Sequence, residues 1–461
     1  MDWLAHLNQR QRAAVTHTDG PLLVIAGAGS GKTRVLTYRI AYLLESGKAL
    51  PSQILAVTFT NKAAQEMKER LRQLVGPIAD SLWVGTFHAT CVQILRRHAD
   101  RIGYKRHFLI FDTSDQIAAM KETLKELNVD QRNFDPRAVL STISAAKNEL
   151  VDWRTYQERA SDFWERNVGR FYEHYQKKLE ANSAMDFDDL LGQTVRLFRE
   201  HPDVLEEYQE RFRYVLIDEY QDTNRAQYVL VSMICARHRN LCVVGDADQS
   251  IYRFRGADIR NILDFERDYE DAKVVKLEQN YRSTKRILEA ANAVIENNLD
   301  RPDKTLFTEN PEGELIRFYR AEDERDEAAF VAEEIERLRR EESFSYQDIT
   351  ILYRTHAQSR TFEEEFIRRG TPYRIVSGVR FYERKEIKDL LAYLRLIANT
   401  DDEFSLRRII NVPKRGIGDT TLGRIQQFAD QEGITLFEAM RRVEEVEDVT
   451  PAYARRVKEF T

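Results

Sequence analysis

The chain has only three cysteines among its 461 residues. Cys91, Cys235 and Cys242 form no C-x-x-C pair, so neither a disulfide framework nor a zinc or iron–sulfur site is indicated. No apolar run is long enough to predict a membrane-spanning helix. The first residues are too polar for a secretory signal. We therefore expect a cytoplasmic protein with reduced, buried thiols.

A strong excess of one charge sign is also missing. Lys and Arg number 70 against 76 Asp and Glu, which gives a net charge of −6. This balance neither requires nor excludes nucleic acid, because a binding groove needs only a local excess of basic side chains. Such an excess lies at residues 96–107, where a solvated helix face is an equally good explanation. The length suits a multidomain protein of about three domains.

A glycine-rich segment follows the first apolar run. Residues 24–33 read V-I-A-G-A-G-S-G-K-T, the pattern of a nucleotide-phosphate loop with alanine at its usual first glycine. Backbone N–H groups of small residues can converge on phosphate oxygens, while Lys32 adds a cation and Thr33 a hydroxyl for Mg²⁺. A glycine-rich turn with an exposed lysine is the alternative. The predicted nucleotide-binding residues here are Ala26, Gly27, Ala28, Gly29, Ser30, Gly31, Lys32 and Thr33.

Four short apolar segments each lead into a polar turn, with helical periodicity between them. We expect strands at 22–25, 54–59, 214–217 and 241–244. This is the layout of a mostly parallel α/β sheet, in which ligands bind at the carboxyl ends of the strands. The second and third strands lie about 150 residues apart, far more than one crossover helix needs. The charged, aromatic stretch at 112–191 is therefore predicted to be a helical insertion.

A second α/β pattern begins near Lys276. Strands are expected at 315–319 and 349–353, and a helix at 327–340. From Phe381 the pattern becomes helical again and ends in an amphipathic, charged stretch.

Two adjacent carboxylates follow the apolar residues 215–217. There Asp218 can hold Mg²⁺ and Glu219 can act as the base that polarises an attacking water. An apolar strand that ends in Asp-Glu is more often a capped turn. Together with Lys32 and Thr33, however, the pair completes the pattern of an ATPase site.

Six sequence blocks together resemble the UvrD, Rep and PcrA group of superfamily 1 DNA helicases. In family order they are Leu7-Asn8 with Gln11 and Ala14-Val15, V-T-F-T-N-K-A-A at 57–64, D-E-Y-Q-D at 218–222, V-V-G-D-A-D-Q-S-I-Y-R-F-R-G-A at 243–257, L-E-Q-N-Y-R-S-T at 277–284, and Phe381 with R-K-E-I-K-D at 384–389. The resemblance implies a P-loop, RecA-like parallel-sheet lobe with a helical insertion, followed by a second RecA-like lobe.

The resemblance implies roles in the ATP site that the residues alone do not. Gln11 would read the adenine edge, and Arg34 and Tyr281 would sandwich the adenine ring. Gln249 and Arg282 would contact the γ-phosphate, with Arg282 supplied by the second lobe. The expected catalytic residues are Lys32, Asp218, Glu219, Gln249 and Arg282, and the expected cofactors are ATP and Mg²⁺, the metal being held by Thr33 and Asp218.

The resemblance also implies a path for single-stranded DNA. Aromatic rings there can stack on bases without reading sequence, although core packing is the alternative for a ring beside a strand. Phe254 stands where the family usually has Trp, so we expect weaker gripping of bases. A structural role is the alternative for His88, and a plain turn before a helix for the Gly-Ile-Gly element at 416–418. The implied DNA contacts are Phe59, Thr60, Asn61, Thr86, His88, Tyr252, Phe254, Arg255, Gly416 and Gly418.

The family pattern continues past residue 461 with two further motifs. We therefore expect an N-terminal portion whose second sheet is incomplete and leaves apolar surface uncovered. The expected domains are 1–111 and 192–275 for the first lobe, 112–191 for its insertion, 276–380 for a partial second lobe, and 381–461 for the start of a second helical insertion.

The leading hypothesis is an ATP-dependent DNA helicase that acts on single-stranded DNA and single/double-strand junctions in repair or replication. Its 3′-to-5′ polarity is implied only by the resemblance. The alternative is a nucleotide-responsive single-stranded DNA binding module without motor activity. A small-molecule kinase would leave the G-D-A-D-Q-S-I-Y block unexplained. No membrane partner is expected, and the sequence identifies no protein partner.

Overall fold

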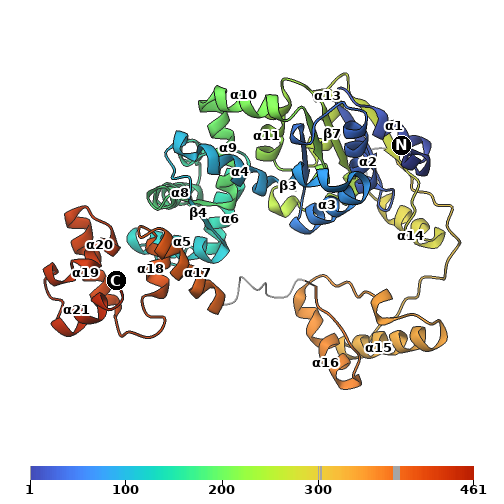
Figure 1. Ribbon diagram of the computed structural model, residues 1–461. Helices are drawn as coiled ribbons and strands as arrows, with labels where there is room; N and C mark the ends of the chain where they lie inside the picture. Colours follow the sequence, from blue (N-terminus) through green and yellow to red (C-terminus); the bar gives the residue numbers. More distant parts are fainter. Residues whose placement is uncertain (1, 299–300, 302–303, 377–384) are drawn as a thin grey trace. The chain divides into compact units, whose positions relative to one another are not determined.

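The computed structural model in Figure 1 describes residues 2–298, 301, 304–376 and 385–461. The chain divides into two compact units, Met1–Gly313 and Glu314–Thr461. This division lies beyond the lobe boundary that we expected at residue 276. None of the described helices is both long and apolar enough to cross a membrane.

A six-stranded parallel sheet forms the centre of the first unit, in the order β3-β2-β6-β7-β1-β8. The four predicted strands are confirmed to within one residue at their ends. β3 and β8 were not predicted, and β8 pairs with β1 across the residue where the second lobe was expected to begin. The strands are β1 Leu22–Ala26, β2 Ile54–Thr58, β3 Trp83–Thr86, β6 Tyr214–Ile217, β7 Leu241–Gly245 and β8 Lys273–Leu277.

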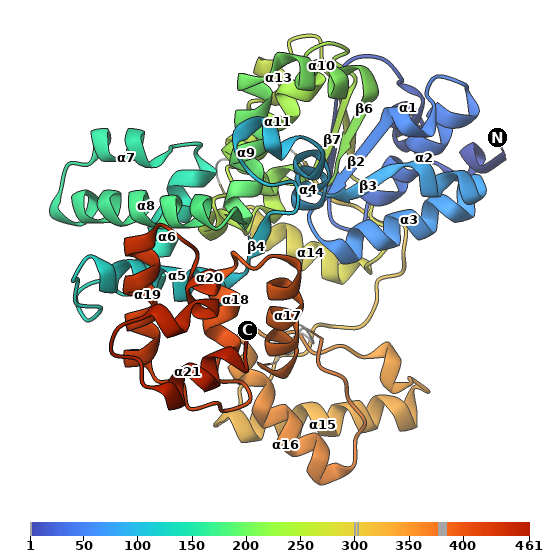
Figure 2. The same cartoon turned by 60° about the vertical axis from the view of Figure 1, so that its left-hand side comes forward.

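Helices cover both faces of this sheet (Figures 1 and 2). Their bounds are α1 Gln9–Thr16, α2 Lys32–Glu45, α3 Asn61–Val75, α4 Phe87–His98, α11 Arg225–Cys235, α12 Arg260–Leu263, α13 Phe265–Asp268 and α14 Lys285–Ile295. Side chains alternate along each strand, so Leu23 and Ile25 enter one hydrophobic core with α4 and α11, while Leu22 and Val24 enter the other with α1, α2 and α3. These two buried cores fix the strand ends and therefore the loops that follow them.

The predicted helical insertion lies between β3 and β6. Strands β4 (Leu109–Phe111) and β5 (Ala184–Asp186) pair in parallel near its two ends. Buried Lys147 lies 2.7 Å from Asp186 and 2.9 Å from Asp189, an arrangement in which each buried charge has an opposite partner. The helices are α5 Thr113–Glu126, α6 Pro136–Asn148, α7 Trp153–Arg159, α8 Phe163–Ala181, α9 Phe187–Glu200 and α10 Pro202–Arg211. Helix α9 continues past the expected end of the insertion at residue 191.

In the second unit the predicted helix is confirmed as α15 (Glu324–Glu341), which packs with α16 (Ser359–Arg369) around a small core. The strands expected at 315–319 and 349–353 are wrong, because the described residues of this unit form no strand. A strand of a parallel sheet depends on hydrogen bonds to a neighbouring strand, and local sequence cannot replace them.

Some side chains of these two segments pack against neighbouring helices, and others are exposed to solvent. Tyr319 stacks on Phe330 with ring centroids 3.9 Å apart, and Ile351 packs against the core between α15 and α16. Phe318 and Leu352 remain 87% and 90% exposed. Both side chains therefore lie outside the small core between α15 and α16.

The remaining described residues of the second unit are mainly helical, as predicted. Phe381 and Arg384, which belong to one of the family blocks, lie outside the described residues. Leu406, Ile409 and Ile425 are fully buried in a separate core. The helices are α17 Lys385–Ala398, α18 Glu403–Ile409, α19 Asp419–Glu432, α20 Leu436–Arg441 and α21 Pro451–Lys458.

Candidate functional site

The glycine-rich loop at 27–31 connects β1 to the N-terminus of α2. Gly29 and Gly31 have φ angles of +67° and +92°, which favour glycine, and Gly31 caps α2. The hydroxyl of Ser30 donates a hydrogen bond of 2.8 Å to the carbonyl oxygen of Gly27 and closes the loop. The backbone N–H groups at the start of α2, with the positive end of its dipole, are suited to bind phosphate, and phosphate binding by this loop stays a prediction.

A second segment of the chain packs directly on this loop. The Asn280 Nδ2 donates to the Ala28 carbonyl oxygen at 2.6 Å, and the Tyr281 N–H donates to the Gly29 carbonyl oxygen at 2.9 Å. A Cβ atom on Gly29 would lie only 2.6 Å from Asn280 Nδ2. Glycine is therefore required for the close approach that brings Arg282 beside the loop.

The predicted carboxylates follow β6. Glu219 adopts a left-handed backbone conformation with φ of +51°, and its Oε2 lies 2.9 Å from Lys32 Nζ. The Gln221 Nε2 also donates to this oxygen at 2.9 Å. Burial and the neighbouring charge of Glu219 raise the pKa of Asp218 to about 7, while Lys32 opposes the shift. The structure thus joins the loop lysine to the proposed base.

The residues expected to hold Mg²⁺ offer the right kind of donor. Thr33 lies in the first turn of α2, and Asp218 is buried directly after β6. Mg²⁺ usually keeps several waters and takes one or two carboxylate or hydroxyl oxygens together with substrate phosphates. No group of three His, Cys, Asp or Glu side chains suited to a metal occurs in the described part of the chain. A hydroxyl and one carboxylate fit this ion with a bound nucleotide.

The residues expected around adenine occupy α1, α2 and the 279–282 segment. Buried Gln11 donates from Nε2 to the Ser30 carbonyl oxygen at 2.9 Å and accepts from the Asn8 N–H at 3.2 Å. Its amide thus braces the phosphate loop, a role the sequence did not suggest. The Asn8 Nδ2 donates to the Tyr281 hydroxyl at 2.8 Å, and the Arg34 guanidinium lies 5.4 Å from the Tyr38 ring centroid. The adenine contacts stay a prediction.

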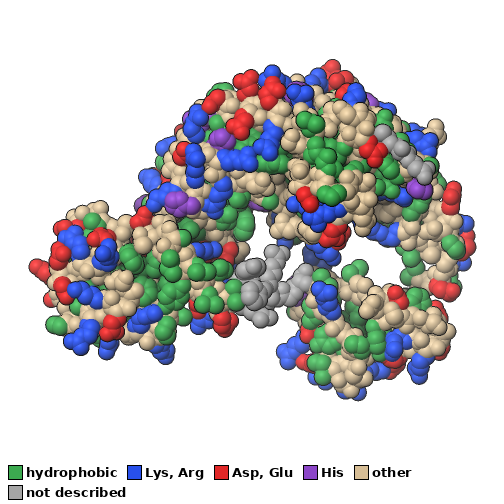
Figure 3. Space-filling model, in the orientation of Figure 1, with side chains coloured by type: hydrophobic (Ala, Val, Ile, Leu, Met, Phe, Trp, Pro, Cys, Tyr) green, Lys and Arg blue, Asp and Glu red, His purple; other side chains and the backbone are tan. Residues whose placement is uncertain are grey.

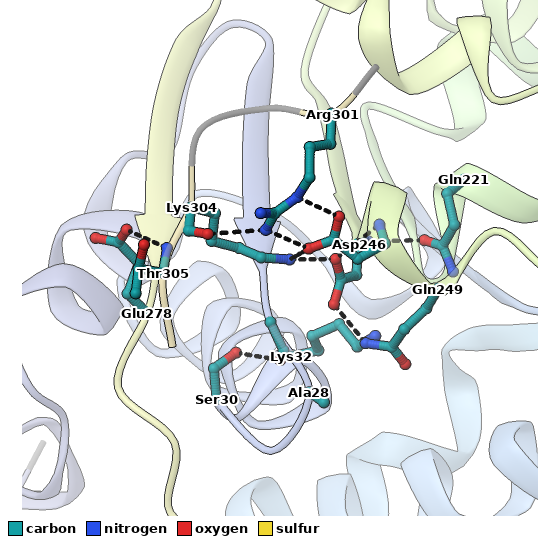
Figure 4. A network of polar contacts seen from close by, with 12 residues as sticks. Ala28, Ser30, Lys32, Gln221, Asp246, Gln249, Glu278, Arg301, Lys304 and Thr305 are labelled. Carbon is teal, nitrogen blue, oxygen red and sulfur yellow. Dashed lines mark hydrogen bonds and ion pairs between the residues drawn. The ribbon is translucent and has the colours of Figure 1, made fainter. Parts of the chain in front are cut away.

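Gln249, the predicted γ-phosphate contact, follows β7 (Figure 4). Its Nε2 donates to Asp246 Oδ2 at 2.5 Å. The same carboxylate accepts from Lys304, which lies outside every block that the sequence pointed to. Asp246 lies within the family block at 243–257, but the sequence predicted neither a role for it nor its pairing with Lys304.

Three predicted DNA contacts of the first unit form a row of aromatic rings. Phe254 is exposed, whereas Phe59 and Tyr252 are half-buried. The rings of Phe59 and Tyr252 lie 4.8 Å apart, and those of Tyr252 and Phe254 lie 6.0 Å apart. The guanidinium of Arg255 lies 5.2 and 5.6 Å from the centroids of Tyr252 and Phe254. Phe254 is 73% exposed, which excludes core packing for this ring. Stacking of bases on such a row contributes about 1–3 kcal/mol per base.

The face of the first unit visible in Figure 3 carries basic and acidic side chains side by side. Binding of nucleic acid needs only a local excess of basic groups. Arg255, beside the rings of Tyr252 and Phe254, is one such group.

Three other predicted contacts lie at helix starts. Thr60 and Thr86 cap α3 and α4 through their hydroxyls, which accept from Ala63 and Ala89 N–H groups. Asn61 is exposed at the first position of α3. These caps give both threonines a structural role, whether or not they also touch DNA.

His88 is mostly buried in the first turn of α4. Burial lowers the pKa of its imidazole, which favours the neutral ring at pH 7. Its ring meets that of Phe187 edge to face, with centroids 6.0 Å apart. Phe187, which the sequence did not single out, is 45% exposed at the start of α9. Its position beside a predicted contact is visible only in the structure.

The Gly-Ile-Gly element lies in the second unit, before α19. Gly416 has a φ of +70°, and a Cβ there would lie 2.8 Å from Arg456 Nη1. Gly418 is the N-cap of α19, and Asn411 exchanges hydrogen bonds with the backbone of Ile417. The geometry accounts for a tight turn before a helix, and duplex contact stays a prediction.

Comparison with known proteins agrees with this site. The pattern of the UvrD/REP helicase N-terminal domain matches residues 7–270, and that of the UvrD-like helicase C-terminal domain matches residues 275–460. The chain belongs to the UvrD/REP helicase family.

Two relatives illustrate how far the similarity extends. The ATP-dependent DNA helicase PcrA of Bacillus subtilis (strain 168) is 56% identical over 441 residues, covering 96% of this chain and 60% of the relative. The ATP-dependent DNA helicase PcrA of Staphylococcus aureus (strain Mu50 / ATCC 700699) is 54% identical over 437 residues, covering 95% and 60%. The chain thus spans 60% of the length of these relatives. These coverages do not by themselves support the predicted truncation.

Proposed function

We propose that the chain is an ATP-dependent DNA helicase and translocase that moves 3′ to 5′ on single-stranded DNA. One observation carries the proposal. The short segment 246–255 holds both Gln249, the predicted γ-phosphate contact, and the neighbouring rings of half-buried Tyr252 and exposed Phe254. A change at the phosphate can therefore reach the DNA contacts through a few residues. Because ATP and DNA are its proposed substrates, we place its action in the cytoplasm, at single/double-strand junctions in repair or replication.

The proposed hydrolysis uses groups that already surround the loop. The N-terminus of α2 and Lys32 would bind the phosphates. Lys32 would then leave its 2.9 Å ion pair with Glu219, and Glu219 would accept the proton of the attacking water. When bound by Thr33 and Asp218, Mg²⁺ would neutralise charge on the β- and γ-phosphate oxygens. Arg282, exposed beside the loop, would add a further cation at the γ-phosphate.

The test compares unwinding of two duplexes that differ only in the polarity of their single-stranded tail. We expect ATP-dependent strand separation from a 3′-tailed duplex and little from a 5′-tailed one, because movement on the tail must proceed toward the junction. Fluorescence dequenching of a labelled strand reports the rate. Unwinding of the 5′-tailed duplex alone would contradict the polarity. Nucleotide-dependent binding without unwinding of either duplex would favour the module without motor activity.

A further inference from the structure

A buried ion-pair cluster includes Asp246, the carboxylate that accepts a hydrogen bond from Gln249 (Figure 4). Lys304 is 4% exposed at its side chain and contacts both Asp246 and Asp248, the latter at 2.9 Å. Arg301 contacts Asp248 at 2.8 Å and the Lys304 carbonyl oxygen at 2.8 Å. Burial tends to raise the pKa of Asp248, but hydrogen bonds from Arg301 and Lys304 lower it below its usual value. The cluster thus pairs two basic side chains with two carboxylates.

The two oxygens of Asp246 have different partners. Oδ1 accepts from Lys304 and from the Asp248 N–H, whereas Oδ2 accepts from Gln249 Nε2 at 2.5 Å. The backbone N–H of Asp246 donates to Gln221 Oε1 at 2.9 Å. Because Lys304 holds one oxygen, the carboxylate cannot rotate freely, and the other oxygen keeps facing Gln249.

Lys304 belongs to a stretch that also touches the phosphate loop. A Cβ atom on Gly27 would lie 2.1 Å from Leu306 Cδ2, so Leu306 covers the backbone of the loop. The Asn280 N–H donates to the Phe307 carbonyl oxygen at 2.7 Å, which ties this stretch to the segment carrying Arg282. The stretch 304–307 therefore contacts the phosphate loop, the segment that carries Arg282, and the carboxylate of Asp246.

We propose that Lys304 is a positioning residue that orients Gln249 toward the γ-phosphate by fixing the carboxylate of Asp246. The inference rests on the proposed function, since Gln249 must act on ATP for its orientation to matter. In this role Lys304 acts through Asp246.

The test measures ATP turnover at saturating single-stranded DNA for the wild type, Lys304→Met and Lys304→Arg. We expect Lys304→Met to lower kcat roughly 10- to 100-fold while KM for ATP changes by less than about threefold, because small misplacements of a catalytic group act mainly on the chemical step. Lys304→Arg keeps the charge and the donors and should lie closer to the wild type. Lys285→Met, at a half-exposed lysine paired with Glu312, is the matched control and should leave kcat unchanged.

A double variant separates positioning from charge balance. Lys304→Met leaves one carboxylate of the cluster without a cation, and Asp246→Asn in the same chain restores neutrality. We expect the double variant to regain thermal stability while kcat stays low, since no lysine then fixes the side chain at position 246, which contacts Gln249. Recovery of both would overturn the inference, as would an unchanged kcat in Lys304→Met. Absence of turnover in the wild type would instead refute the proposed function itself, and the inference with it.

Discussion

Replacing Glu219 by Gln is expected to lower DNA-stimulated ATP turnover by about 10²–10⁴-fold, the contribution typical of a general base. The amide keeps the shape of the carboxylate but cannot accept a proton from the attacking water. ATP binding should persist, because the phosphate loop and the N-terminus of α2 remain intact. Lys32 also loses its 2.9 Å ion pair with Glu219, so it is free to bind a phosphate group. Phosphate release measures kcat, and a fluorescent ATP analogue measures affinity.

The matched control is Glu206→Gln on α10. Glu206 is 67% exposed at its side chain and pairs with Arg237 at the surface, so its loss should leave turnover unchanged. If Glu219→Gln retains turnover within about twofold of the wild type, Glu219 is not the base.

Replacing Arg282 by Ala is expected to lower kcat by about 10³–10⁵-fold, the range for an arginine that stabilises the transferring phosphoryl group. Its Cβ would lie 2.8 Å from a Cβ placed on Gly29, so the residue stands against the phosphate loop. The Asn280 side chain accepts from the Arg282 backbone N–H at 2.9 Å and fixes the turn. Rapid-quench measurement of a single turnover isolates the chemical step.

Arg267→Ala serves as the control for Arg282, because Arg267 is 71% exposed at its side chain and pairs locally with Asp264. That variant should hydrolyse ATP like the wild type. A single-turnover rate for Arg282→Ala within about tenfold of the wild type would assign the γ-phosphate contact to another group.

Sequence reasoning predicted the strands that carry a local signature. Each of the four predicted strands is an apolar run followed by a polar turn, and each lies inside the sheet, where both faces are buried. β3 and β8 are the two edge strands, and their mixed sequences at 83–86 and 273–277 lack a continuous apolar run. The segments at 315–319 and 349–353 are rich in apolar and aromatic residues but have no neighbouring strand among the described residues, so the strand prediction was wrong there.

In the candidate site, likewise, some residues could be predicted from local sequence and others could not. Lys32 and Glu219 could be named from sequence because each follows a strand of the same sheet at its carboxyl end, where parallel strands bring their loops together. The pairing of Lys304 with Asp246 joins residues 58 positions apart and depends on how the chain returns to the loop after β8. The bracing of the loop by Gln11 likewise required the packed structure.

The most direct test is steady-state ATP hydrolysis by the 461-residue chain with and without single-stranded DNA, with Lys32→Ala as the blank. Our prediction is turnover that single-stranded DNA stimulates strongly and that Lys32→Ala abolishes, because the proposed nucleotide and DNA contacts share the segment 246–255. Turnover that is the same with and without DNA, or that survives in Lys32→Ala, would contradict it.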